Sequence, residues 1–226
     1  SSRRRHTRFR NVTGVQTCAL PICDNERVVF KADRSLRGRG IAVISREAFD
    51  LAKVSQLGNG VFQNYIDQHP VFAQFSPRAV ATLRVTTTVD DAGEVKVRAC
   101  YLRLGRQADT HVQSQSHVRV PIDICSGEFH NQGYLTNWLP VEAHPDTGVS
   151  FAGHRVPAFT ECLATVTALH ATVRPARSIG WDVTVNRDGR VEVMELNATH
   201  NDIKFSEASQ GPCFRDLHWE RLALKP

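Results

Sequence analysis

The sequence predicts an α+β protein with mostly antiparallel sheets, arranged in two lobes. Strand-like segments are joined by short turns at residues 90–93 and 188–189, which is typical of antiparallel hairpins. Only two segments have apolar residues at helical spacing, and no internal repeat is visible. A chain of 226 residues is long enough to bury a substantial core.

The smaller lobe is expected at residues 24–66 and combines strands with one helix. A small-residue loop, Ser35–Gly40, separates the first two strands. Ser45 offers an N-cap to a helix that runs to about Leu57. The expected strands are Val28–Lys31, Ile41–Ile44 and Val61–Ile66.

The larger lobe is expected at residues 67–226 and contains a hairpin-rich sheet. The expected strands are Thr82–Val89, Glu94–Arg103 and Val118–Ile124, followed by a last hairpin at Ile179–Leu196. Pro157 suits the first turn of a helix. The buried face of that helix would carry Phe159, Cys162, Leu163, Val166, Leu169 and Val173. The tail after the hairpin is expected to be irregular.

Residues 1–23 are expected to lie outside the fold, as an artefact or a disordered leader. They hold five arginines and no acid, so the other residues carry 23 basic against 23 acidic side chains. The net charge of +5 therefore gives no support to nucleic-acid binding by the body of the protein. Val12–Ile22 back-translates to a common sequencing-library adapter, which predicts a translated artefact. We then expect the N-terminal part of the natural lobe to be missing, so that this chain binds Mg-ATP weakly or not at all and is inactive if the missing part is essential.

Cysteine usage and hydropathy favour a cytoplasmic protein. Outside residues 1–23 the cysteines form no C-x-x-C pair and have no zinc-like spacing. No apolar run approaches the ~18 residues that a membrane helix needs. The sequence gives no indication of the oligomeric state.

The last hairpin brings two acids together. Asp188-Gly189 signals a two-residue type I′ turn, which places Asp182 directly across from Glu195. Their Cβ atoms would be ~5 Å apart, and Asn197 would share their face. The opposite face would be core and would carry Trp181, Val183, Val185, Met194 and Leu196.

These acids suit a metal ion. Two opposed carboxylates repel each other unless a proton or a cation lies between them. The oxygen donors of Asp182, Glu195 and Asn197 suit Mg²⁺, which binds one or two carboxylates together with substrate phosphates. A solvated hairpin face is the alternative, and spacing alone does not decide between the two.

Several motifs, in order along the chain, resemble those of ATP-grasp enzymes. Asp182, Glu195 and Asn197 resemble the signature that holds two magnesium ions on ATP, Mn²⁺ being an alternative ion. The resemblance implies that ATP binds between two lobes. It implies phosphate contacts for Lys31, Ser35, Gly38, Gly40, Arg84 and Arg103. It implies adenine contacts for Gln63, Asn64, Tyr65 and Ile66. For Arg84, a salt bridge to Asp182 or Glu195 is an equal alternative.

A narrower set of motifs, including His144–Gly148 and Ile179–Asp182, resembles the sugar-transfer-associated branch, which is often labelled alpha-L-glutamate-ligase-related. This implies a ligase that makes an acylphosphate from a small carboxylate and joins it to an amine or similar nucleophile, in polysaccharide or amino-acid ligation. One rival is a degenerate, non-catalytic nucleotide-binding module. Another is a metal-dependent hydrolase that uses the same acidic hairpin without nucleotide.

Overall fold

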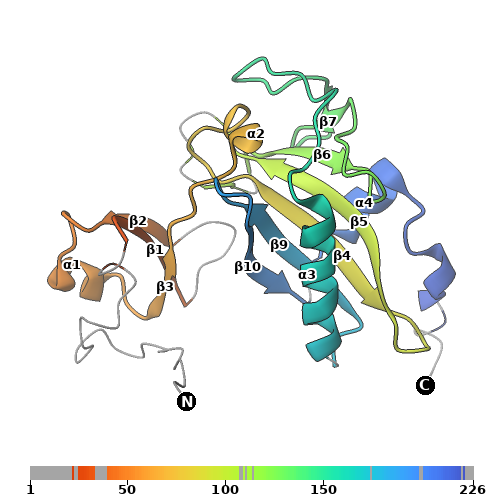
Figure 1. Cartoon of the computed structure of the whole chain (residues 1–226), viewed down its shortest axis with the longest axis horizontal. Coiled ribbons are helices and arrows are strands. Elements are labelled where there is room, and N and C mark those ends of the chain that lie inside the picture. The colour runs from red at the N-terminus through yellow and green to blue at the C-terminus, as the bar shows by residue number, and fades with distance from the viewer. Residues whose placement is uncertain are drawn as a thin grey trace. The chain divides into compact units, whose positions relative to one another are not determined.

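The computed structural model describes residues 22, 25–33, 40–106, 109, 111–113, 115–173, 175–198, 201–219 and 221. The chain divides into two compact units, residues 1–66 and 67–226. Each unit has its own antiparallel sheet, labelled in Figure 1. The predicted α+β class with antiparallel sheets is therefore confirmed.

The small unit contains a three-stranded sheet in the order β2-β1-β3. Its elements are β1 (Arg27–Ala32), β2 (Ile41–Ser45), α1 (Leu51–Gln56) and β3 (Gly60–Asn64). Val28 and Phe30 point to one face of β1 and are buried there, packed with Ile44 and Phe62. Alternation along the strand therefore turns Lys31 to the opposite face.

The helix of the small unit begins later than predicted. Ser45 is the last residue of β2, and its hydroxyl accepts only from the Ala48 amide. Asp50 is the true N-cap, because its carboxylate accepts from the amides of Ala52 and Lys53. A carboxylate at this position satisfies amides that the first turn leaves unpaired, which fixes the start of α1.

The large unit contains a seven-stranded sheet in the order β10-β9-β4-β5-β6-β7-β8. Its strands are β4 (Thr82–Val89), β5 (Val95–Leu104), β6 (Val118–Ile122), β7 (Gly133–Tyr134), β8 (Pro140–Val141), β9 (Ser178–Val185) and β10 (Val191–Asn197). Its helices are α2 (Pro70–Ala73), α3 (Phe159–Thr172) and α4 (Ile203–Gln210), with a short 3-10 helix η3 (Arg215–Leu217). The central pairs, β9 with β4 and β4 with β5, are antiparallel over most of their lengths.

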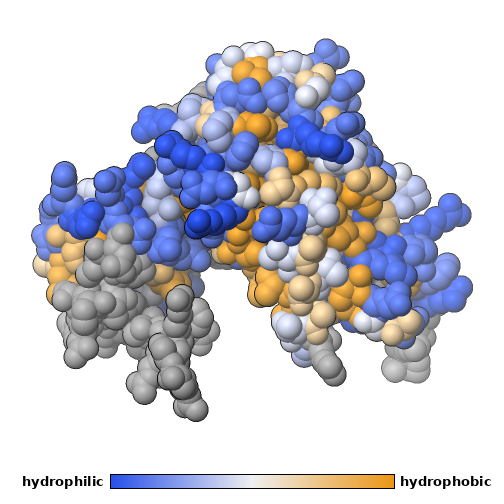
Figure 2. Space-filling model, viewed as in Figure 1, coloured by the Kyte–Doolittle hydropathy of each residue, from blue (hydrophilic) through white to orange (hydrophobic). Residues whose placement is uncertain are grey.

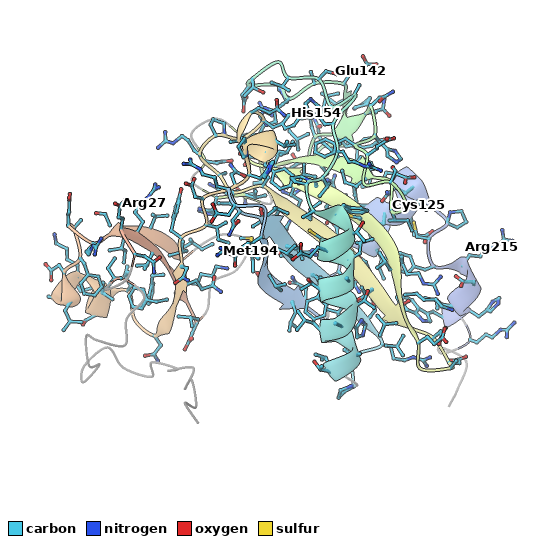
Figure 3. All side chains as sticks on the ribbon, in the orientation of Figure 1. Arg27, Cys125, Glu142, His154, Met194 and Arg215 are labelled. Atoms are coloured by element: carbon cyan, nitrogen blue, oxygen red, sulfur yellow. The ribbon has the colours of Figure 1, made fainter. Side chains whose placement is uncertain are left out.

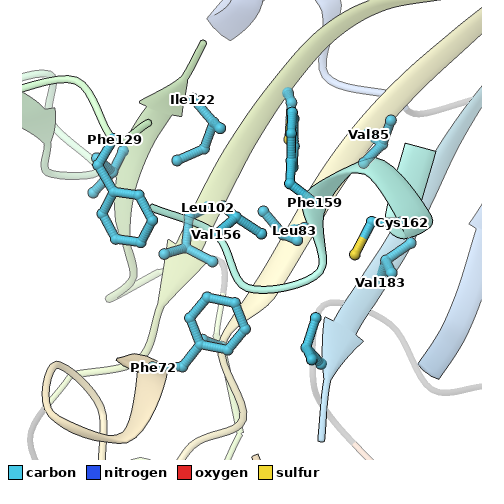
Figure 4. Close-up of a cluster of buried hydrophobic side chains, with 14 of the residues drawn as sticks. Phe72, Leu83, Val85, Leu102, Ile122, Phe129, Val156, Phe159, Cys162 and Val183 are labelled. Carbon is cyan, nitrogen blue, oxygen red and sulfur yellow. The ribbon is translucent and has the colours of Figure 1, made fainter. Parts of the chain in front are cut away.

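The main core lies between α3 and the sheet. Figure 4 shows part of this cluster, which Leu83, Leu102, Val183 and Cys162 fill. On α3, Phe159, Cys162 and Val166 are buried as predicted, and Leu163 and Val173 pack against the same cluster. Leu169 is wrong as a core residue, since it is 38% exposed. His170 turns inward instead, because both of its ring nitrogens have hydrogen-bond partners in the interior.

A buried chain of hydrogen bonds ties α3 to the sheet. Trp181 Nε1 donates to the Thr87 hydroxyl over 2.8 Å, and that hydroxyl lies 2.6 Å from His170 Nδ1. His170 Nε2 lies 2.8 Å from the carbonyl of Ala176, which can only accept, so Nδ1 is left to accept from Thr87. One hydroxyl thus satisfies two buried side chains.

Replacing Thr87 with valine is expected to lower the free energy of unfolding by about 2–6 kcal/mol. The change keeps the shape but leaves Trp181 Nε1 and His170 Nδ1 buried without a partner, at about 1–3 kcal/mol each. Urea denaturation measures the loss. Thr172→Val, at an exposed position of α3, is the matched control and should change stability by less than about 0.5 kcal/mol.

The segment after the hairpin was predicted to be irregular. This prediction is wrong, because the segment contains α4. The start of α4 cannot be recognised from the usual N-cap pattern, because Asp202 has a positive φ of 58° and its side chain does not cap the helix. Phe205 is the one large apolar side chain that α4 buries, against the ring of Tyr101 at 4.7 Å. Tyr101 alternates with Cys100 and Leu102 of the α3 core, so α4 covers the opposite face of the sheet.

The surface of the large unit is mixed, with apolar residues visible in the region of α3 and β10 (Figure 2). Val193 and Leu196 of β10 are 38% and 49% exposed, because β10 is the edge strand of the sheet. Leu196 is therefore wrong as a core residue, and Met194 is only half-buried, whereas Trp181, Val183 and Val185 are buried as predicted. None of the helices in the described ranges combines the length and apolar composition that a membrane crossing requires.

Candidate active site

The face of the large sheet opposite α3 carries charged side chains from neighbouring strands. Arg84 lies between two core residues of β4, and Asp182 lies between two core residues of β9. The register places Arg84 opposite Asp182 on one side and opposite Tyr101 on the other. Arg103 of β5 is opposite Thr82, one step along the same face.

Both oxygens of the Asp182 carboxylate are bound by arginines. Arg84 Nε donates to Oδ1 over 2.6 Å, and Arg84 Nη2 donates to Oδ2 over 3.2 Å. Arg103 Nη2 donates to Oδ2 over 2.6 Å. Of the two roles left open for Arg84, the structure therefore shows the salt bridge.

The charged side chains of Asp182 and Arg84 are buried, and each changes the pKa of the other. Burial alone would raise the pKa of Asp182, but the positive charges of Arg103 and Arg84 outweigh it and hold that pKa below its ordinary value. For Arg84, burial opposes the charged form, and the negative charge of Asp182 overcomes it and raises the pKa. Asp182 and Arg84 are therefore both ionised at neutral pH, with only 8% and 6% of their side chains exposed.

The hairpin has the predicted register at Asp182, but its turn differs from the predicted one. Asn186 pairs with Arg190 across a three-residue loop, and Gly189 has a positive φ of 81°. The two-residue turn is therefore wrong. The Asn186 side chain accepts from the amides of Asp188 and Arg190, which stabilises the longer loop.

A bulge then corrects the register. Val193 pairs with Val183, but Glu195 pairs with Asp182, so Met194, marked in Figure 3, is an extra residue. The bulge cancels the one-residue shift of the loop, and the predicted opposition of Asp182 and Glu195 is confirmed. Asn197 is opposite Gly180 and shares their face.

Glu195 differs from Asp182 in its surroundings. It is exposed, and no ion pair to its carboxylate occurs within the described ranges. The repulsion expected between the two acids is relieved on the Asp182 side by Arg84 and Arg103. The cations that let these acids lie opposite each other are thus arginines of the protein itself.

The predicted nucleotide residues of the small unit lie on and beside its sheet. Lys31 is half-buried on the face opposite the small core, with Val61 and Ile41 as its neighbours in register. Gln63 points to the same face and Asn64 to the other, where the Asn25 amide donates to its side chain. Tyr65 and Ile66 follow β3, and Gly40 precedes β2. Ser35 and Gly38 lie outside the described residues.

Three residues of the polar face were missed by sequence reasoning. The Tyr101 hydroxyl donates to an oxygen of Asp202 over 2.7 Å. Arg119 of β6 lies directly opposite Arg103. Alternation along β5 from Arg103 would have found Tyr101, and Arg119 is a charged residue in an otherwise apolar strand. No local signal points to Asp202, whose place depends on tertiary packing.

Comparison with known proteins gives the family. The sequence profile described as sugar-transfer associated ATP-grasp matches residues 51–217, which is most of the chain. The chain belongs to this family. The match includes β3, the polar face of the large sheet and the acidic hairpin. A search of curated proteins finds no match.

Two solved structures resemble this ATP-grasp chain. One is an ADP complex of N5-carboxyaminoimidazole ribonucleotide synthetase, with 12% identity and a TM-score of 0.49; the match covers 80% of this chain and 37% of that one. The other is an N5-carboxyaminoimidazole synthetase from Staphylococcus aureus, with 11% identity and a TM-score of 0.47, covering 87% and 40%. The chain thus spans less than half the length of either protein.

The donor set of the ATP-grasp hairpin fits hard divalent ions. Asp182 and Glu195 are opposed, Asn197 is one step beyond, and all three offer oxygen donors on one face. Within the described ranges, no group of three or more His, Cys, Asp or Glu side chains forms a metal site by itself. A metal ion held here would compete with Arg84 and Arg103 for the Asp182 oxygens, so these arginines would need another anion.

Proposed function

We propose that this chain is the nucleotide-binding and metal-binding part of an ATP-dependent carboxylate ligase. The observation that carries the proposal is the cluster in which two arginines hold Asp182 opposite the exposed Glu195, which has no ion pair among the residues that the structure describes. Anionic phosphates supply what this cluster lacks, because they give the arginines a new partner and free the Asp182 carboxylate for a cation. Membership of the ATP-grasp family supports the same reading.

The residues of the two units then have separate tasks. Lys31 contacts the phosphates, with Gly40 in the loop beside it, and the backbone groups of Gln63, Asn64, Tyr65 and Ile66 bind the adenine. Asp182, Glu195 and Asn197 would hold Mg²⁺, which when bound supplies positive charge to the phosphates. Arg84 and Arg103 transfer their hydrogen bonds from Asp182 to the phosphate oxygens. Arginine suits this exchange, since its planar fork matches carboxylate and phosphate alike.

The reaction needs no protein nucleophile. An oxygen of the substrate carboxylate attacks the γ-phosphorus; the new O–P bond forms as the bond to the β–γ bridging oxygen breaks, and ADP leaves with the electron pair. An amine or similar nucleophile then attacks the acyl carbon, phosphate leaves, and the nucleophile loses its proton to solvent. Arg84 and Arg103 contribute by positioning and by stabilising negative charge.

Hydroxylamine trapping tests the proposal. The chain is incubated with ATP, Mg²⁺, hydroxylamine and a panel of carboxylic acids, and hydroxamate and ADP are measured. We expect equal amounts of the two products, formed only when both an acid and Mg²⁺ are present. Nucleotide binding without ADP formation would favour a non-catalytic module, and turnover without nucleotide would favour a metal-dependent hydrolase. Either result contradicts the ligase.

Replacing Lys31 with methionine is expected to raise the KM or Kd for ATP by about tenfold or more. A charge-assisted hydrogen bond to phosphate contributes about 1.5–3 kcal/mol, and 1.4 kcal/mol corresponds to a factor of ten. Isothermal titration with ATP measures the change. Lys53→Met, an exposed lysine of α1 in the same unit, is the matched control and should leave ATP affinity unchanged.

A further inference from the structure

Two arginines face each other on the polar side of the large sheet. Arg103 of β5 and Arg119 of β6 are direct partners in the antiparallel register, and both point away from the α3 core. Like charges directly opposite each other destabilise a sheet. Such a pair calls for an anion between or above the two guanidinium groups.

Within the described residues, the acidic side chains pair with only one of these two arginines. Arg103 reaches Asp182 through Nη2, but its Nε is buried without a hydrogen bond. Arg119 is only 8% exposed, its Nε is also buried without a hydrogen bond, and it has no ion pair within the described ranges. Its Nη2 donates to the carbonyl of Leu135 over a long 3.4 Å. Burying a cation in this way is costly unless a partner arrives.

Aromatic rings hold Arg119 in place without neutralising it. Its Cζ lies 4.7 Å from the ring of Trp138 and 4.3 Å from the ring of Phe205. Trp138 is 44% exposed and has a positive φ of 68°, which is strained for a residue with a bulky side chain. Of the two rings over Arg119, the indole is thus the exposed one, since Phe205 is buried.

Space for a ligand adjoins this arginine pair. A cavity of about 220 Å³ lies beyond the end of β5 and before the start of β6, where Arg106, Gln115 and Ser116 line it. Its lining is largely polar and comprises Arg106, Gln115, Ser116, Leu135, Thr136 and Asn137. Leu135 belongs to this wall and also accepts from Arg119, so the cavity and the guanidinium group are neighbours.

We propose that Arg103 and Arg119 form the subsite for the carboxylate of the acid substrate, with the rest of that substrate in the adjoining cavity. This rests on the proposed ligase function, which requires a carboxylate to approach the γ-phosphate. Arg103 is the link, because it contacts Asp182 on one side and faces Arg119 on the other. One guanidinium group then contacts both reacting anions and reduces their repulsion.

The side-chain Nε–Hε signals of the two arginines test the subsite directly by NMR. Adding succinate, a simple carboxylate probe, should shift the signals of both Arg103 and Arg119, whereas the uncharged succinamide should not. Arg119→Lys keeps the charge but loses the stacked planar fork, and should weaken succinate binding by at least about tenfold. Arg177→Lys, an exposed arginine paired with Asp91, should bind succinate as the wild type does.

Two outcomes would overturn the subsite: no shift with succinate, or equal succinate affinity in Arg119→Lys and the wild type. Neither involves nucleotide, so each leaves the hydroxylamine test of the ligase function standing. If the chain forms ADP as a ligase and Arg119→Lys binds the acid as tightly as the wild type does, the ligase function stands and the subsite is wrong. With an active acid from the panel, the same variant should raise the KM for the acid and leave the KM for ATP unchanged.

Discussion

Replacing Asp182 with alanine is expected to lower the free energy of unfolding by about 3–5 kcal/mol. The carboxylate has only 8% of its side chain exposed and is the shared partner of two guanidinium groups. Its removal leaves Arg84, with 6% of its side chain exposed, as a buried charge without its main partner. Breaking one side of a buried ion pair costs more than the pair contributes, because the remaining charge has lost both water and its counterion. Chemical denaturation of both proteins measures the difference.

Asp91→Ala is the matched control for this loss. Asp91 also pairs with an arginine, Arg177, but 95% of its side chain is exposed, and an exposed pair of this kind contributes little. Its removal should leave the unfolding transition unchanged. Equal effects of the two substitutions would show that Arg84 and Arg103 find other partners readily, and would contradict the buried cluster as a source of stability.

The same cluster is expected to make the free energy of unfolding fall at acidic pH. Because the folded protein lowers the pKa of Asp182, the contribution of this residue is present above the ordinary carboxyl pKa of ~3.9 and is lost as the pH falls through the lower, folded value. Asp182→Asn removes that titration. Its stability should therefore fall less steeply than that of the wild type below about pH 4.

Sequence reasoning was most accurate where a local pattern and the tertiary structure agree. The strand at Thr82–Val89 was predicted to the residue, because alternating apolar side chains between turn signals specify it. The opposition of Asp182 and Glu195 was also correct, although the loop is one residue longer than predicted. The bulge at Met194 compensates for that difference, and a bulge on an edge strand has no local signal in a sequence.

The misses share a tertiary cause. Leu169 fits the helical stripe as well as its neighbours, but His170 takes the inward place through hydrogen bonds to Thr87 and Ala176. Asp202 begins α4 in a left-handed conformation, and its carboxylate accepts from Tyr101, a residue 101 positions away. Patterns of period two or 3.6 do not contain such partners, so neither residue could be placed from sequence.

Glu195 offers the sharper test of function, because it is exposed and makes no ion pair within the described residues. Replacing Glu195 with alanine is expected to lower the rate of ADP formation by about 100-fold or more. The acid would hold a metal ion that stabilises several kcal/mol of transition-state charge, and each 1.36 kcal/mol is a factor of ten in rate. Coupled detection of ADP, at saturating ATP and acid, measures the change.

The unfolding free energy of Glu195→Ala should remain within about 0.5 kcal/mol of the wild type or rise slightly, since the substitution removes a like charge opposite Asp182. Asp188→Ala, which removes an exposed acid from the tip of the same hairpin, should affect neither quantity. Asp182 is thus expected to serve both the fold and the reaction, whereas Glu195 serves only the reaction. If Glu195→Ala turned over ATP at the wild-type rate, the acidic hairpin would not be the metal site, and the arginines would hold Asp182 for stability alone.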